Sequence, residues 1–181
     1  REHWLTLQGF ESGSTIRKLV VVFAIVFGLW HIATNLYLTE PGLWQNAIHF
    51  AGFAFLASVI YSPFRASAKS TKALTFDLVY GLLVAAAALW VAGNESALYE
   101  RTLAVTGQSW QFSWIDWCAG GLLVIAAIDF SRRVSGWVIP CLIILALSYI
   151  LFLGTHFDGV FRSASLPIDD VLFRTLYNDE G

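Results

Sequence analysis

Charge is what this sequence has least of. Only 13% of its 181 residues are Asp, Glu, Lys or Arg, while 57% are hydrophobic and the mean hydropathy is +0.64. Soluble domains carry about 25% charged residues, so the composition excludes a water-soluble globule and with it a soluble enzyme. The net charge of -2 also excludes a basic surface for nucleic acid. We therefore expect a non-enzymatic integral membrane protein.

Cysteine and proline are also scarce, with two and four residues respectively. So few cysteines exclude a disulfide-stapled secreted module, and eight Trp, six Tyr and fourteen Phe exclude a disordered tail. Cys118 and Cys141 are predicted to lie at different depths on neighbouring helices, too far apart to bridge. We interpret both as packing residues.

Five apolar segments are long enough to cross the bilayer, which takes about 20 residues in a helix. They predict an all-α integral membrane bundle of about five transmembrane helices, at 17–38, 44–62, 76–92, 114–133 and 137–153. The fourth span is the weakest, and we place Asp116 and Asp129 near its two interfaces, where a carboxylate reaches water. Residues 1–16 then form a cytoplasmic tail, 17–154 a membrane domain, and 155–181 a periplasmic connector.

Orientation follows from the excess of Lys and Arg on the cytoplasmic side of membrane proteins. An N-terminus inside and a C-terminus outside place most of the cations together: Arg1, Arg17, Lys18, Arg65, Lys69, Lys72, Arg132 and Arg133. The same orientation collects an aromatic belt at the outer interface: Tyr37, Trp44, Trp90, Trp110, Trp114 and Trp117.

The connections predict further structure. Residues 134–136 form so short a link that the fourth and fifth spans should be antiparallel neighbours that move as one body. Asp169 and Asp170 favour a helix N-terminus, and apolar residues recur at helical spacing after Pro167: Ile168, Leu172 and Leu176. We therefore expect a short amphipathic helix at the outer interface. The N-terminal tail can lie on the inner surface in the same way.

His31 and His49 are the first candidate site residues. Each lies nine residues from Glu40 on adjacent spans, so both should sit at similar depth. Facing imidazoles are what a haem or a metal needs. The alternative, which we favour because two ligands make a poor metal site, is hydrogen bonding within the bundle through Thr34, Asn35, Gln45 or Asn46.

Asp129 precedes Arg132 by three positions and Arg133 by four, the favourable order for ion pairs on one helix face. An interfacial ion pair that fixes the depth of the fourth span is the favoured interpretation, and a proton relay or a lipid-headgroup site is the alternative. Asp77 is interpreted as an acid at a helix N-terminus.

Small residues on the second to fourth spans predict close helix packing: Ala47, Ala51, Ala54, Ser58, Gly81, Ala85, Gly120 and Gly121. The spans show neither a Gly/Pro-rich break in their middle nor an acid at the bilayer centre, the features that bind substrates and ions in transporters. The sequence therefore indicates a scaffold.

Several segments resemble one family: GLWHIATNLYL, QNAIHFAGFAF, IDWCAGGLLVIAAIDFSRRVSGWVIPCLIILALSYILFLG and FRTLYNDEG. They are similar to the N-terminal part of fused TRAP transporter permeases of the type paired with TAXI binding proteins, over residues 17–181. The most specific piece is Asp129, Arg132, Arg133, Gly136, Trp137 and Pro140, and His31 and His49 also match. Asp129 departs mildly from the family, where Glu is more frequent.

The resemblance implies a scaffold part of a sodium-coupled secondary transporter that imports organic acid anions across the bacterial inner membrane. Its partners would be a large transport subunit or domain, which would hold the sodium, a periplasmic substrate-binding protein and membrane lipids. No cofactor is expected on this chain itself. Two alternatives stay open: a haem-binding redox anchor using His31 and His49, and a partner-binding membrane protein without a transport role. The chain is either a separate subunit or an excerpt of a longer permease.

Overall fold

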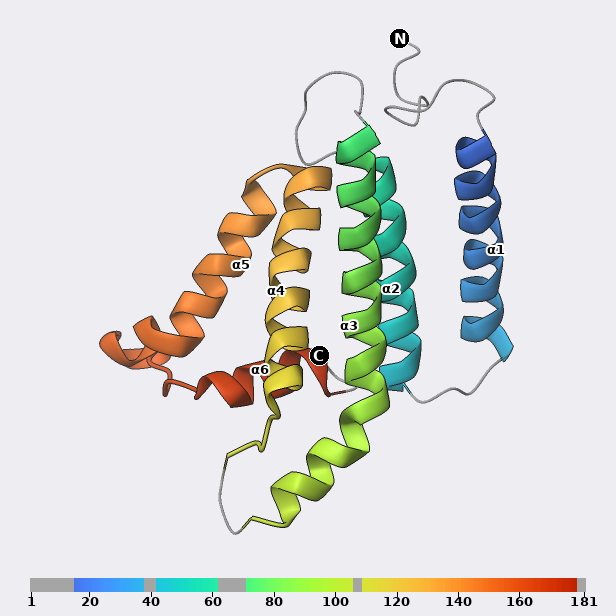
Figure 1. The fold of residues 1–181 in the computed structure, drawn as a ribbon. Helices are drawn as coiled ribbons and strands as arrows, with labels where there is room; N and C mark the ends of the chain where they lie inside the picture. The colour runs from blue at the N-terminus through green and yellow to red at the C-terminus, as the bar shows by residue number, and fades with distance from the viewer. Residues whose placement is uncertain (1–14, 38–41, 62–70, 106–108, 179–181) are drawn as a thin grey trace.

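The computed structural model describes residues 15–37, 42–61, 71–105 and 109–178. Every regular element within these ranges is a helix. Five helices run side by side and a sixth lies across one end of the bundle (Figure 1). Their bounds are α1 Thr15–Tyr37, α2 Gly42–Ile60, α3 Thr71–Leu103, α4 Trp114–Ser135, α5 Val138–Ser148 and α6 Ile168–Leu176. The predicted all-helical fold is thus confirmed for the described residues. The tail before residue 15 lies outside them.

Within the described ranges, five helical segments are long and apolar enough to cross a membrane, as the sequence predicts. The third helix differs most from its predicted span of 76–92, because α3 continues to Leu103 and passes the ends of its neighbours (Figure 1). Residues 94–103 carry Glu95, Glu100 and Arg101, so this last part of α3 is polar and suited to water. We call the two ends of the bundle the Arg133 end and the α6 end.

Small side chains hold α2, α3 and α4 together. The core between them is rich in alanine: Ala51, Ala54, Ala87, Ala88, Ala119 and Ala126 are all buried. Gly81 on α3 packs so closely on Ser58 of α2 that a side chain at position 81 would meet the Ser58 hydroxyl. Because small residues let helix backbones approach, this contact confirms the predicted close packing of α2 and α3.

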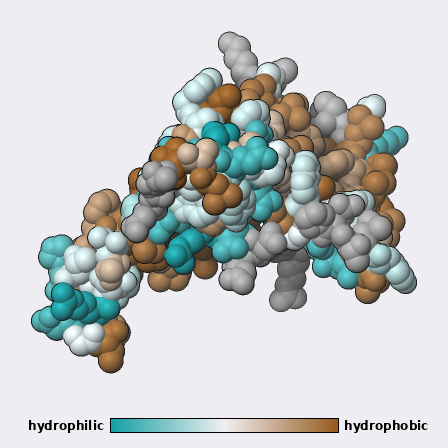
Figure 2. All heavy atoms as spheres, turned by 90° about the horizontal axis from the view of Figure 1, so that it is seen from below, coloured by the Kyte–Doolittle hydropathy of each residue, from teal (hydrophilic) through white to brown (hydrophobic). Residues whose placement is uncertain are grey.

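The first and fifth helices lie at the edges of the bundle. Large apolar side chains on both are more than half exposed, among them Leu19, Leu29 and Leu36 on α1 and Val138, Leu142 and Leu145 on α5. Viewed from the α6 end, hydrophilic atoms gather over the middle and at the left-hand end of the molecule, and hydrophobic atoms show beside them and toward the right (Figure 2). The apolar flanks are what lipid or a partner membrane protein would cover.

The fifth span ends irregularly. A π-helical turn, Tyr149–Leu153, follows α5 directly, and two 3-10 turns, Gly154–His156 and Gly159–Phe161, lead on to α6. The Tyr149 hydroxyl donates to the carbonyl of Phe161 over 2.5 Å, which closes this segment into a hook. The hook turns the chain from the direction of α5 to the crosswise direction of α6 (Figure 1).

Candidate functional site

Arg133 is the centre of a charged cluster at one end of the bundle. Its guanidinium lies 2.5 Å from Asp129 on the same helix and 3.7 Å from Asp77 on α3. It also donates to the carbonyl of Tyr61, directly after α2, over 3.1 Å. One side chain of α4 therefore joins the ends of α2 and α3, and we call this group the Arg133 hub.

The hub is almost closed to solvent. The side chains of Arg133 and Asp77 are 3% and 1% exposed, and the guanidinium carbon lies over the rings of Tyr80 and Phe130 at 5.5 and 5.3 Å. A guanidinium suits such a site, because it is weakly hydrated and stacks on aromatic faces. The predicted pair of Asp129 and Arg133 is confirmed, but sequence spacing missed Asp77 as a partner on another helix.

The link between α4 and α5 completes this end. Arg132 donates to Asp129 over 2.7 Å, and its guanidinium carbon lies 5.7 Å from the centre of the Trp137 ring. Gly136 has a φ of 77°, a left-handed conformation that favours glycine, and its N–H bonds the carbonyl of Arg132. Arg132, Gly136 and Trp137 thus form the turn between α4 and α5, directly beside the Arg133 hub.

The two span histidines touch one another. The Nδ1 atoms of His31 and His49 lie 3.1 Å apart and the ring centroids 4.3 Å apart, with Phe53 packed against both rings. One ring donates its N–H and the other accepts, so the pair is a hydrogen bond between α1 and α2. The Asn35 amide nitrogen lies 3.4 Å from Nε2 of the His31 ring and also donates to the carbonyl of His31, to which the Thr34 hydroxyl donates as well.

This contact bears on the haem alternative. An iron held by both imidazoles would lie between the two rings, so α1 and α2 would have to move apart from the observed contact. In the described part of the chain, no group of three or more His, Cys, Asp or Glu side chains has the arrangement of a metal site. The sequence interpretation expected hydrogen bonds within the bundle, but it named Thr34, Asn35, Gln45 or Asn46 as partners and missed the direct bond between the two rings.

Asp116 is the centre of the opposite end, and here a sequence expectation is wrong. We expected this carboxylate to reach water, but its side chain is 1% exposed. It accepts from Arg101 over 2.6 Å, from the Trp90 indole over 2.9 Å, and from both the N–H and the hydroxyl of Ser113 over 2.8 Å. The reason is the length of α3, which continues past the start of α4 and so brings the Arg101 side chain within reach of Asp116.

Helix α6 packs against this end through aromatic rings. Phe173 stacks on Trp110 with ring centroids 3.4 Å apart, while the Trp110 indole donates to Asp170 and its backbone N–H to Asp169, both over 3.0 Å. Leu172 lies directly on Gly120 of α4. The predicted amphipathic helix is confirmed, and its acids anchor Trp110 besides favouring the helix N-terminus.

Tyr177 closes the same region. Its side chain is fully buried, and its hydroxyl forms no hydrogen bond with the described residues. Burial, followed by the nearby Asp116 carboxylate, raises the pKa of the Tyr177 phenol well above its ordinary 10.0. The phenol is therefore held in its neutral form.

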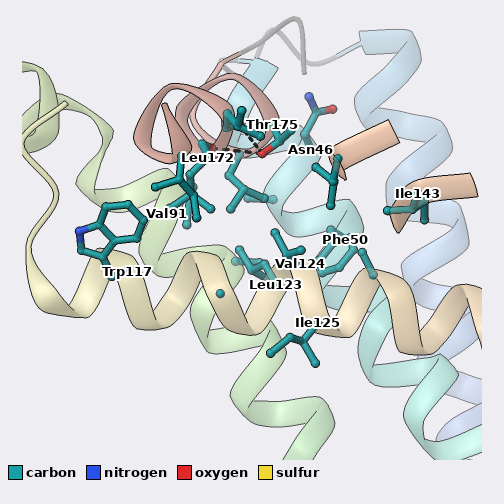
Figure 3. A pocket seen from close by; sticks show the side chains of 18 of the residues that line it. Asn46, Phe50, Val91, Trp117, Leu123, Val124, Ile125, Ile143, Leu172 and Thr175 are labelled. Carbon is teal, nitrogen blue, oxygen red and sulfur yellow. Dashed lines mark hydrogen bonds between the residues drawn. The ribbon is translucent and has the colours of Figure 1, made fainter. Parts of the chain in front are cut away.

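An apolar groove extends from the α6 end toward the middle of the bundle. It has a volume of about 750 Å³ and is walled by α2, α4 and α5, with α6 at one end and small contributions from α3. Val124, Leu123 and Phe50 point into it, and Asn46 and Thr175 stand at its α6 end (Figure 3). Its walls are almost wholly aliphatic or aromatic, so it offers packing surface and hardly any hydrogen bonds.

The structure thus assembles two polar clusters, a histidine pair and a groove. Sequence spacing found Asp129 with its arginines and the two histidines, but not the partners that come from distant helices, Asp77 and Arg101. Trp90 and Trp110, which we expected in an interfacial belt, each donate to a buried or partly buried aspartate. Each of these bonds joins a tryptophan to an aspartate far away along the chain, so the pairs can be recognised only once the positions of the helices are known.

Comparison with known proteins identifies no relative: no family model, no curated protein and no solved structure matches this chain.

Proposed function

We propose that this chain is the non-catalytic scaffold part of a sodium-coupled, binding-protein-dependent TRAP-type secondary transporter that imports organic acid anions. The observation that carries the scaffold role is the pinning of α3 to α4 at both ends. Arg133 pairs with Asp77 at one end, and Asp116 pairs with Arg101 and Trp90 at the other. Elements with few buried contacts open easily, whereas a pair of helices locked at both ends resists opening.

The transport class rests on the resemblance of the sequence, and its most specific residues cluster at the Arg133 hub. In this proposal the hub end faces the bacterial cytoplasm and the α6 end faces the periplasm, where the binding protein would dock. Sodium and substrate are held by the large partner. The apolar flanks of α1 and α5 supply surface for that partner or for lipid.

The test is to purify the tagged chain from its native membrane and to reconstitute what accompanies it. We expect a membrane protein of ten or more spans, and uptake of radiolabelled dicarboxylate or amino-acid-like anions that needs a sodium gradient and the binding protein. Uptake should fall when Arg133 is replaced by Leu and persist when the exposed Leu142 is replaced by Ala. A Soret band in the purified chain, or uptake that ignores sodium, contradicts the proposal.

A further inference from the structure

The length of the groove between α2, α4, α5 and α6 limits what can occupy it. Along α4 its wall runs from Trp117 to Ala127, ten positions apart, which corresponds to about 15 Å of helix rise. That is about half of the ~30 Å hydrocarbon thickness. The groove is therefore one leaflet deep, which is too short for a helix that crosses the whole membrane.

One end of the groove is closed. Helix α6 lies across it, and Leu172 packs directly on Gly120 in the second turn of α4. In the close view, α6 stands over the Trp117 end of α4 while the wall continues to Ile125 (Figure 3). A partner helix running parallel to α4 would collide with α6, whereas a thin flexible chain can lie below it.

The walls have the chemistry of a hydrocarbon site. Helices α2, α4 and α5 supply most of them, and all three lie among the segments apolar enough to cross a membrane, so the groove sits where acyl chains are the surrounding medium. Among the polar side chains of the lining, Asn46 and Thr175 stand at the α6 end, close to the expected headgroup level (Figure 3), and His49 lies about one helical turn deeper on α2. An unfilled groove would forfeit the dispersion contacts of its lining.

We propose that this groove holds one acyl chain of a phospholipid from the leaflet on the α6 side. The chain lies along α4 between α2 and α5, below α6, and the headgroup stays beside Asn46 and Thr175. The lipid fills the wedge between α5 and α2 and so supports the angle at which α5 leaves the bundle. This binding is independent of the transport function proposed above, since it depends only on the shape of this chain.

Gly121 provides a sharp test. It lines the groove, and a side chain added there meets open space within 4 Å, so Gly121→Phe fills the groove without a clash at its first carbon. Gly28→Phe on α1 is the matched control, because that position is equally open and lies outside the groove. The probe is dioleoylphosphatidylethanolamine, added to the detergent-purified full chain and followed by native mass spectrometry.

We expect the wild type and Gly28→Phe to retain one phospholipid mass, and Gly121→Phe to lose it at least tenfold more readily. A wild type that retains none, equal retention by Gly121→Phe, or a dimer in place of the lipid overturns the proposal. If Gly121→Phe does not fold, as judged by circular dichroism, Leu147→Trp replaces it. Leu147 lines the groove on α5, and Leu142→Trp on the exposed face of the same helix is its control.

Discussion

The two ends of the bundle bury charge in opposite ways. At the Arg133 end a buried cation is the centre, its neighbours are two acids and two aromatic rings, and its Nε forms no hydrogen bond with the described residues. At the α6 end a buried anion is the centre, and Asp116 accepts four hydrogen bonds from three residues. The comparison teaches that one end depends on charge balance and the other on hydrogen-bond saturation.

The largest expected effect is at the Arg133 end. Arg133→Leu leaves Asp77 and Asp129 without their shared cation, and breaking a buried pair costs about 3–5 kcal/mol. Unfolding in mixed micelles, followed by circular dichroism, measures the change in the free energy of unfolding. Arg132→Leu is the control, since Arg132 is 27% exposed and should cost less than about 1 kcal/mol.

A double variant sharpens the interpretation of this end. If charge balance governs the hub, Asp77→Leu combined with Arg133→Leu should lose less stability than the sum of the two single variants. Additive losses would mean that the two side chains act independently, and the contrast between the ends would disappear.

The second largest effect is at Asp116. Asp116→Ala removes one acceptor from Arg101, Trp90 and Ser113 together, and hydrogen bonds to a charged group contribute about 1.5–3 kcal/mol each. We expect a loss of about 2–3 kcal/mol in the same unfolding measurement, because Arg101 is 38% exposed and recovers water. Asp158→Ala, at an exposed carboxylate, should change nothing.

A smaller effect concerns the attachment of α6. Phe173→Leu removes the ring stacked on Trp110, an interaction worth about 1 kcal/mol beyond its buried area. Trypsin should then cleave after the exposed Arg174 several-fold faster, because α6 opens locally more often. Phe161→Leu is the control, since that ring is 68% exposed. Equal cleavage rates would show that α6 is held by something other than this stack.

The smallest effect is one of pH. The Tyr177 phenol has a raised pKa in the folded chain, so its contribution to stability is fully present below its ordinary pKa of 10.0 and is lost as the pH rises through the raised value. Tyr177→Phe removes a buried hydroxyl without a hydrogen bond, so it should be near neutral at pH 7. Above about pH 10 it should unfold less readily than the wild type. Parallel pH curves for the two proteins would contradict this assignment.

Sequence patterns predicted the parts of this fold that depend on neighbours along the chain. Apolar run length predicted the five spans, and the i, i+4 spacing predicted the pair of Asp129 with Arg133. The helical recurrence of Ile168, Leu172 and Leu176 predicted α6. Each of these signals lies within one helix or one turn.

The partners that join different helices could not be predicted in the same way. Asp77 and Arg133 are 56 positions apart, and nothing in either local sequence specifies their rotation toward each other. Asp116 was expected to reach water because it lies near one end of its span, whereas α3 continues as a helix beyond its predicted end and delivers Arg101. Contacts between side chains on different helices depend on how each helix is rotated and on how long it is. Composition and hydrophobic periodicity determine neither of these.

The central claim is that α3 and α4 form one rigid body pinned at both ends, and one distance measurement tests it directly. A spin-label pair at Cys118 on α4 and at Leu82→Cys on α3, in a Cys141→Ser background, reports the separation of the two helices in the chain reconstituted with its proposed transport partner. We expect one narrow distance distribution that stays unchanged when sodium, anionic substrate and the binding protein are added. A second population, or a shift of the peak upon addition, would contradict the claim.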